Sequence, residues 1–214
     1  LRTEMLLFIL LLLCRTAIQC NIGKGGFGPR IMLKGLGVWY AFGLLACTYL
    51  CFLYVLDVVQ DGNGQRGLKC WILAIPALIG TVLLFSNPWT KAVYFINLVN
   101  YYKKGPAAYL IPGVCMLYLV AGFFLAVFGA FRAGGVQRRG ELGKLAAAFL
   151  FPVAGALVEK ITSMDAAWAF IVAALLWVYL GIQKGQVTQD GLTGLNNRRR
   201  LDQYMWELDE RGGE

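Results

Sequence analysis

Residues 105–131 read GPAAYLIPGVCMLYLVAGFFLAVFGAF and contain no Asp, Glu, Lys or Arg. An α-helix rises 1.5 Å per residue, so about 20 apolar residues cross a hydrocarbon core of roughly 30 Å. Comparable charge-free stretches occur at Gly35–Leu56, Cys70–Thr90 and Ala166–Gln183. These four stretches predict a chain that crosses a membrane repeatedly.

Two further segments are shorter but also favour membrane helices. Leu145–Val158 reaches spanning length only by including Glu159 and Lys160. Met5–Leu13 is followed by Arg15, whose charge must lie at an interface or snorkel towards it. A buried or interfacial helix is the alternative for both. We expect an all-α, polytopic bundle with six visible spans, near residues 4–20, 36–58, 70–88, 108–131, 145–161 and 166–183.

Composition excludes several kinds of chemistry. Hydrophobic residues make up 58% of the chain and charged residues 15%, against about a quarter charged in soluble domains. The chain has no His, which rules out a phosphoaccepting histidine, a His-dependent triad or an imidazole ligand within it. Cys47 and Cys51 share a helix face but lack a third ligand, so we interpret them as packing residues. We predict no metal site and no nucleic-acid partner.

A different pattern follows the last apolar run, where residues 190–200 read DGLTGLNNRRR. Asp190 and Thr193 are good capping residues, and the two glycines of this stretch allow sharp reversals of the chain. Farther on, one helical stripe is formed by Leu201, Tyr204, Met205 and Leu208. The pattern predicts a turn followed by an amphipathic helix in water.

This segment resembles the opening of a GGDEF domain, the module of diguanylate cyclases. It fits the D-x-L-T-G-L-x-N-R-R signature of that family at every fixed position, namely Asp190, Leu192, Thr193, Gly194, Leu195, Asn197, Arg198 and Arg199. The resemblance implies that residues 190–214 are the N-terminal fragment of an α/β domain. It also implies that the matching residues have a structural and coupling role.

The same resemblance implies a mechanism for a complete domain. Two GGDEF domains meet as half-sites, each holding GTP with Mg²⁺ or Mn²⁺, and make cyclic di-GMP as a homodimer. The catalytic, metal-binding and GTP-binding residues of that family come later than residue 214. We therefore assign no catalytic, cofactor-binding or metal residue here, and we expect the 214-residue chain itself to be inactive.

Two segments flank the turn between the third and fourth expected spans. Ser86–Trp89 reads SNPW, and the aromatic segment Tyr101–Pro106 ends in Gly-Pro. With these features, the region from about Asn87 to Val178 is similar to the seven-helix sensor region at the front of some bacterial histidine kinases and cyclases. We expect a chain truncated at both ends, with residues 1–183 as the sensor region and residues 184–189 as a linker.

The connection Ser86–Pro106 is the candidate sensing segment. Its polar and aromatic residues could line a pocket for a small amphipathic or anionic ligand, with Asn87, Trp89, Tyr101 and Tyr102 as candidates. They could equally form an aromatic belt at the membrane interface, where Trp and Tyr gather. The signal itself is not predicted.

Orientation follows mainly from the tail. GTP and cyclic di-GMP belong in the cytoplasm, and the basic residues favour a cytoplasmic C-terminus only modestly. We expect a multi-pass protein of the inner (plasma) membrane. The leading hypothesis is the sensor portion of a diguanylate cyclase, and a non-catalytic GGDEF-like receptor is the alternative. A transporter or channel with a chance tail match is disfavoured, because the spans hold few ionisable groups.

Overall fold

The structure is a computed structural model that describes residues 2–60, 67–133, 136–162, 169–174, 176–177 and 180. The chain divides into two compact units, Leu1–Phe149 and Leu150–Glu214. The expected linker and GGDEF fragment, including Asp190, Leu192, Thr193, Gly194, Leu195, Asn197, Arg198 and Arg199, lie outside the described residues. Much of the expected sixth span does so as well.

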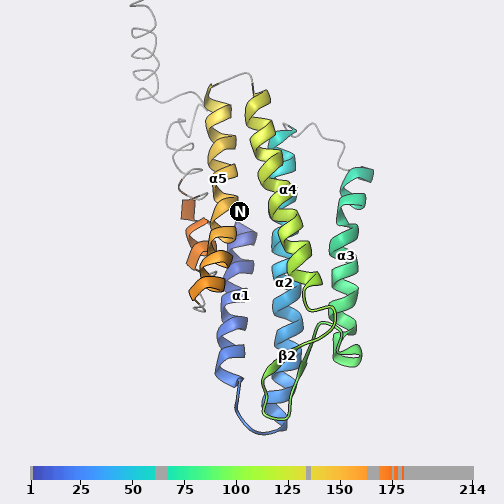
Figure 1. The fold of residues 1–214 in the computed structure, drawn as a ribbon. Helices are drawn as coiled ribbons and strands as arrows, with labels where there is room; N and C mark the ends of the chain where they lie inside the picture. The colour runs from blue at the N-terminus through green and yellow to red at the C-terminus, as the bar shows by residue number, and fades with distance from the viewer. Residues whose placement is uncertain are drawn as a thin grey trace, which may run out of the picture. The chain divides into compact units, whose positions relative to one another are not determined.

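The first unit is a bundle of helices with one β-hairpin (Figure 1). In chain order its elements are α1 (Arg2–Asn21), α2 (Phe27–Val59), α3 (Gly67–Thr90), β1 (Tyr94–Ile96), β2 (Tyr102–Lys104), α4 (Leu110–Arg132) and the first part of α5 (Val136–Thr162). Helix α2 is central, since it packs against α1, α3 and α4. In the second unit, the rings of Phe151 and Trp177 lie 6.1 Å apart.

Four helices in the described part of the chain are long and apolar enough to cross a membrane: Phe27–Val59, Trp71–Thr90, Leu110–Arg132 and Arg138–Thr162. They correspond to the expected spans near 36–58, 70–88, 108–131 and 145–161. The expected first span is present as helix α1, but its apolar part, Leu6–Asn21, is shorter than those four. The prediction of six spans is therefore supported for four of them.

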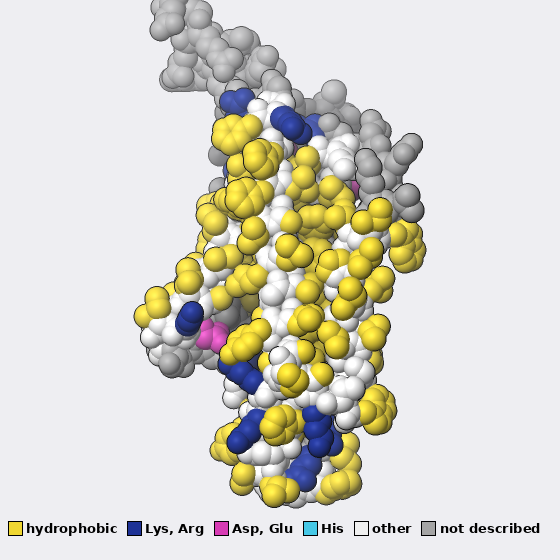
Figure 2. All heavy atoms as spheres, turned by 45° about the vertical axis from the view of Figure 1, so that its right-hand side comes forward, with side chains coloured by type: hydrophobic (Ala, Val, Ile, Leu, Met, Phe, Trp, Pro, Cys, Tyr) yellow, Lys and Arg dark blue, Asp and Glu magenta, His cyan; other side chains and the backbone are white. Residues whose placement is uncertain are grey.

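The surface of the helices is unusually apolar. Between 17% and 28% of the most apolar window of each spanning helix is buried inside the protein. Trp71, Val82 and Phe131 are 70%, 69% and 76% exposed. Figure 2 shows hydrophobic side chains over much of the visible face and several Lys and Arg side chains at its lower end. Such a surface is stable in contact with lipid, as expected of a multi-pass membrane protein.

Small residues bring the helices of the first unit close together. A methyl group on Gly43 would lie 2.4 Å from Leu11, and one on Gly122 would lie 2.8 Å from Phe149. Without a hydrophobic driving force between helices in lipid, such close packing supplies much of their association. Gly129 meets Val59 in the same way, since a methyl group there would lie 2.9 Å from the Val59 side chain.

One backbone hydrogen bond of helix α3 is replaced by bonds to a side chain. Pro76 lies inside the helix, and the hydroxyl of Tyr118 from α4 enters the backbone ladder one residue later. The Ala77 N–H donates to Tyr118 Oη at 3.2 Å, and the Tyr118 O–H donates to Leu73 O at 2.7 Å. One phenol thus bridges two backbone groups that would bond each other in a regular helix, which is a recognised cause of helix bending.

Three features of the fold differ from the sequence prediction. The all-α fold class is correct for the bundle but omits the β-hairpin between α3 and α4. Helix α2 begins at Phe27 rather than near residue 36, because Pro29 is tolerated in a first helical turn. Helix α3 continues to Thr90, so Asn87 and Trp89 lie on its last turn and not in a loop.

Candidate functional site

The β-hairpin lies at the end of the bundle where the α1–α2 connection also lies (Figure 1). Its antiparallel strands pair Tyr94 with Lys104, Phe95 with Lys103 and Ile96 with Tyr102. Asn97 shapes the turn, since its Oδ1 accepts hydrogen bonds from the amides of Val99 and Tyr101 at 3.2 and 2.8 Å. We call this part of the protein, residues 22–37 and 86–106, the hairpin end.

Asn87 fastens strand β1 to helix α3. Its side chain is 3% exposed. The Nδ2 group donates to Tyr94 O at 3.0 Å, and Oδ1 accepts from the amides of Val93 and Tyr94 at 2.8 and 3.1 Å. A buried amide with these bonds fixes the position of β1. Breaking any of the bonds would leave a buried polar group without a hydrogen-bond partner.

Asn100 fastens the hairpin turn to the α1–α2 connection. It is fully buried, and its Nδ2 donates to the carbonyl oxygens of Lys24 and Gly26. Its Oδ1 accepts from Arg30 Nε at 3.1 Å, and Arg30 Nη2 also donates to Leu98 O at 3.0 Å. Two segments that lie at least 70 residues apart in the sequence therefore meet at one amide.

Two tyrosines join the hairpin to α2. The Tyr94 O–H donates to Lys34 O at 3.0 Å, and the Tyr102 O–H donates to Leu33 O at 2.7 Å. Both hydroxyls approach Gly37, where a Cβ would lie 2.6 Å from Tyr94 Oη and 2.9 Å from Tyr102 Oη. Burial raises the pKa of Tyr94 to about 12 and raises that of Tyr102 as well. Both phenols are therefore neutral donors at physiological pH.

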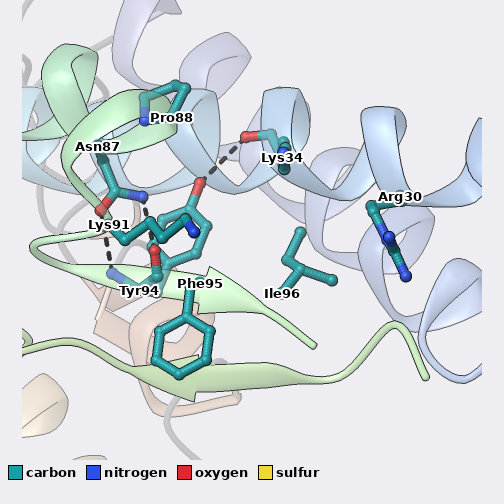
Figure 3. Close-up of a pocket in the computed structure, with 8 residues that line it drawn as sticks. All are labelled: Arg30, Lys34, Asn87, Pro88, Lys91, Tyr94, Phe95 and Ile96. Carbon is teal, nitrogen blue, oxygen red and sulfur yellow. Dashed lines mark hydrogen bonds between the residues drawn. The ribbon is translucent and has the colours of Figure 1, made fainter. Parts of the chain in front are cut away.

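A cavity of about 220 Å³ opens beside this network, and Figure 3 shows its lining. The lining residues come from α2, from the end of α3 and from β1, and they are Arg30, Lys34, Asn87, Pro88, Lys91, Tyr94, Phe95 and Ile96. Three of them are basic and none is acidic. The arrangement can attract an anion, and it offers no carboxylate that would hold a cation.

The four sensing residues predicted from sequence have different positions. Asn87 lines the cavity. Tyr102 is bonded to α2 beside it. Trp89 is 82% exposed and Tyr101 is 53% exposed, and neither lines the cavity. The aromatic belt remains an alternative interpretation of these two exposed rings.

Sequence reasoning did not assign the three basic residues of the cavity to a site. Lys91 directly follows helix α3, whereas Arg30 and Lys34 lie in the first turns of α2, more than 50 residues earlier. The available signal was a charge imbalance: residues 5–56 and 62–140 contain no Asp or Glu, although Lys and Arg recur in both.

Comparison with known proteins gives one match. Residues 30–189 match a family model described as the N-terminal 7TM region of histidine kinase. No curated protein and no solved structure matches the chain. The matched residues begin at Arg30 in the cavity lining, and they include the hairpin and helices α3, α4 and α5.

Proposed function

The chain belongs to the family of N-terminal 7TM regions of histidine kinases, and we propose that it is the membrane sensor portion of a diguanylate cyclase. A complete protein of this kind would make cyclic di-GMP from two molecules of GTP, with Mg²⁺ or Mn²⁺, under the control of a signal. The residues of this chain would receive and transmit the signal and would not touch GTP.

The observation that carries the proposal is the junction at residues 189 and 190. The match to the sensor family ends at Gln189, and the D-x-L-T-G-L-x-N-R-R string begins at Asp190. The eight fixed positions of that string, Asp190 to Arg199, would form the entry to a GGDEF domain. A sensor type found in histidine kinases would thus be joined to a different output domain.

Transmission would depend on the short linker 184–189. A segment of this length passes on helix movements that a long flexible tether would lose. We propose that the last span changes the distance or rotation between two GGDEF domains in a homodimer. Replacing Gln183–Gln189 by a long Gly/Ser linker in the complete protein should abolish the dependence of cyclase activity on the signal. Unchanged regulation would refute this mechanism.

The proposal also specifies an orientation. The C-terminus would lie in the cytoplasm, where GTP is found, and the protein would lie in the inner (plasma) membrane. A fluorescent reporter that folds only in the cytoplasm, fused after Glu214, should be bright. The same reporter inserted after Asn97 in the hairpin turn should be dark. The reversed pattern would refute the orientation.

The decisive experiment extends the coding sequence beyond Glu214 and assays the complete protein in membranes. Conversion of GTP to cyclic di-GMP, absent from the 214-residue chain, is the expected result. A GGDEF domain without activity would favour the non-catalytic receptor. A histidine kinase domain, or no output domain at all, would refute the proposal, and the latter would favour a transporter or channel with a chance tail match.

A further inference from the structure

The cavity at the hairpin end carries an uncompensated positive charge. Arg30, Lys34 and Lys91 line it, and residues 22–37 and 86–106 contain three more lysines and no acidic residue. Arg30 donates to the neutral oxygen atoms of Asn100, Asn97 and Leu98. Like charges around one cavity repel each other, and this repulsion is larger beside an apolar bundle than in water.

The ammonium groups of Lys34 and Lys91 have no protein acceptor within the described part of the chain. Lys104, another lysine of the hairpin end, does have a partner. It donates to Tyr109 Oη at 3.1 Å, and its ammonium group lies 4.9 Å from the centre of that ring. The two cavity lysines therefore differ from Lys104, because they can give their hydrogen bonds to a ligand.

Lys91 occupies a backbone conformation that lysine rarely adopts. Its φ is 55°, in the left-handed region, at the position after a helix where glycine is most common. A side chain there is disfavoured because its Cβ crowds the backbone, and the interaction of the ammonium group with the helix dipole offsets a part of this cost. The strained position holds a positive charge at the cavity.

The size of the cavity limits the ligand. The cavity has a volume of about 220 Å³ and is partly open to the surroundings. This is enough for a phosphate or carboxylate group with a few atoms attached, and it is below the range of about 300–1,000 Å³ typical of pockets for drug-sized ligands. The neutral hydroxyls and amides of the wall are committed to bonds within the protein.

We propose that this cavity binds a small oxyanion, with phosphate as the model ligand, through Lys34 and Lys91 and within the positive field of Arg30. The oxyanion is either a dissolved ion or the phosphate of an anionic lipid headgroup. Charge-assisted hydrogen bonds from ammonium groups are the interactions suited to such a ligand. The inference goes beyond the proposed function, because anion binding can be measured whatever output domain follows the sensor.

The experiment uses two double variants with equal changes in charge. Lys34→Gln with Lys91→Gln removes the two cavity lysines. Lys24→Gln with Lys103→Gln is the matched control, since both residues belong to the same end and neither lines the cavity. Arg30 is left unchanged because it holds the hairpin turn. Thermal unfolding of the purified 214-residue protein is measured in uncharged maltoside detergent against increasing inorganic phosphate, with chloride at equal ionic strength as the reference.

A second arm tests the lipid source. The same proteins are placed in phosphatidylcholine nanodiscs with and without phosphatidylglycerol, and their unfolding is compared. Protection by inorganic phosphate identifies a dissolved ligand, and protection by phosphatidylglycerol alone identifies a headgroup. The variants are compared in the experiment in which the anion protects the wild-type protein from unfolding. There the cavity double variant should need roughly tenfold more anion for half-maximal protection, whereas the control double variant should match the wild type.

Two results would overturn the proposal. The first is the absence of saturable protection by either anion in the wild-type protein. The second is an equal weakening in the cavity and control variants, which would indicate only the general charge of this end. If the cavity double variant does not fold by circular dichroism, Lys34→Gln alone is compared with Lys24→Gln by the same criterion.

Discussion

The hairpin end and the interior of the helix bundle are held together by different interactions. At the hairpin end, the side chains of Asn87, Asn100 and Arg30 tie backbone segments together through directional hydrogen bonds. In the interior, apolar clusters form around Leu45 and Val55, and glycines allow neighbouring side chains to approach closely. Directional bonds fix one arrangement, whereas packed helices can have two discrete arrangements.

This difference suits a sensor. A binding cavity needs walls whose positions are set before the ligand arrives, since ordering them on binding would cost affinity. A transmembrane interior needs two packings of similar free energy, between which a ligand can shift the population. The following variants break one region or the other, and they are ordered by the size of the expected effect.

The largest effect is expected from Asn100→Ala. The substitution removes three side-chain hydrogen bonds from a fully buried site and places alanine at a φ of 57°. We expect the free energy of unfolding to fall by about 3 kcal/mol or more, measured by thermal unfolding in detergent. Amide hydrogen exchange should accelerate in residues 22–30 and 94–102.

Asn21→Ala is the control for Asn100→Ala. Asn21 also donates through its side-chain amide, but only to Ala17 O within its own helix. Its loss should cost less than about 1 kcal/mol. Equal destabilisation by the two substitutions would contradict the view that one amide organises the hairpin end.

Gly37→Ala should have the next largest effect. The new Cβ would lie 2.6 Å from Tyr94 Oη, so the tyrosine hydroxyls must move and give up their bonds to α2. We expect a loss of about 2 kcal/mol. Gly35→Ala lies on the same helix with no atom within 4 Å of the added Cβ, and it should stabilise by roughly 0.5–1 kcal/mol. Effects of the same sign would refute the close approach at Gly37.

Tyr118→Phe tests the interior. Removing the hydroxyl leaves the Ala77 N–H and Leu73 O without the phenol that bridges them, and the expected loss is about 1 kcal/mol, as for other hydrogen bonds between helices in membranes. Exchange of the Ala77 amide should become faster. Tyr102→Phe deletes the same atom at the hairpin end and should leave that amide unchanged. If exchange at Ala77 is unaffected by Tyr118→Phe, the bridge has no role in α3.

The helices could be predicted from the sequence because their signal is local. A charge-free run such as Gly105–Phe131 favours a spanning helix, since lipid offers no partners for backbone groups, and helix α4 forms over most of it. The close packing of Gly122 and Gly129 was also foreseeable, because small residues are frequent at contacts between membrane helices. The entry motif at Asp190–Arg199 lies outside the described residues and stays a prediction.

The cavity could not be predicted in the same way, because it is built from distant segments. Asn100 and Lys24 are 76 residues apart, and Arg30 reaches Asn100 across 70 residues. The strands beside them have three residues each, which is too short for an alternating pattern to be recognised. The sequence indicated that polar and aromatic residues gather in residues 86–106, but it did not indicate that α2 supplies two of the three cations.

A change of pH within the physiological range should have the smallest effect on the free energy of unfolding. Tyrosine in an unfolded chain has a pKa of about 10, and burial raises the pKa of Tyr94 to about 12. Between these values the unfolded state releases the proton and the folded state keeps it, so the free energy of unfolding should fall as pH rises from about 10 to 12. Below pH 10 this contribution is constant.

A spectroscopic titration of phenolate in the folded protein should show late-titrating tyrosines, fewer of them in Tyr94→Phe and Tyr102→Phe. If both variants titrate like the wild type, the two hydroxyls are not sequestered against α2.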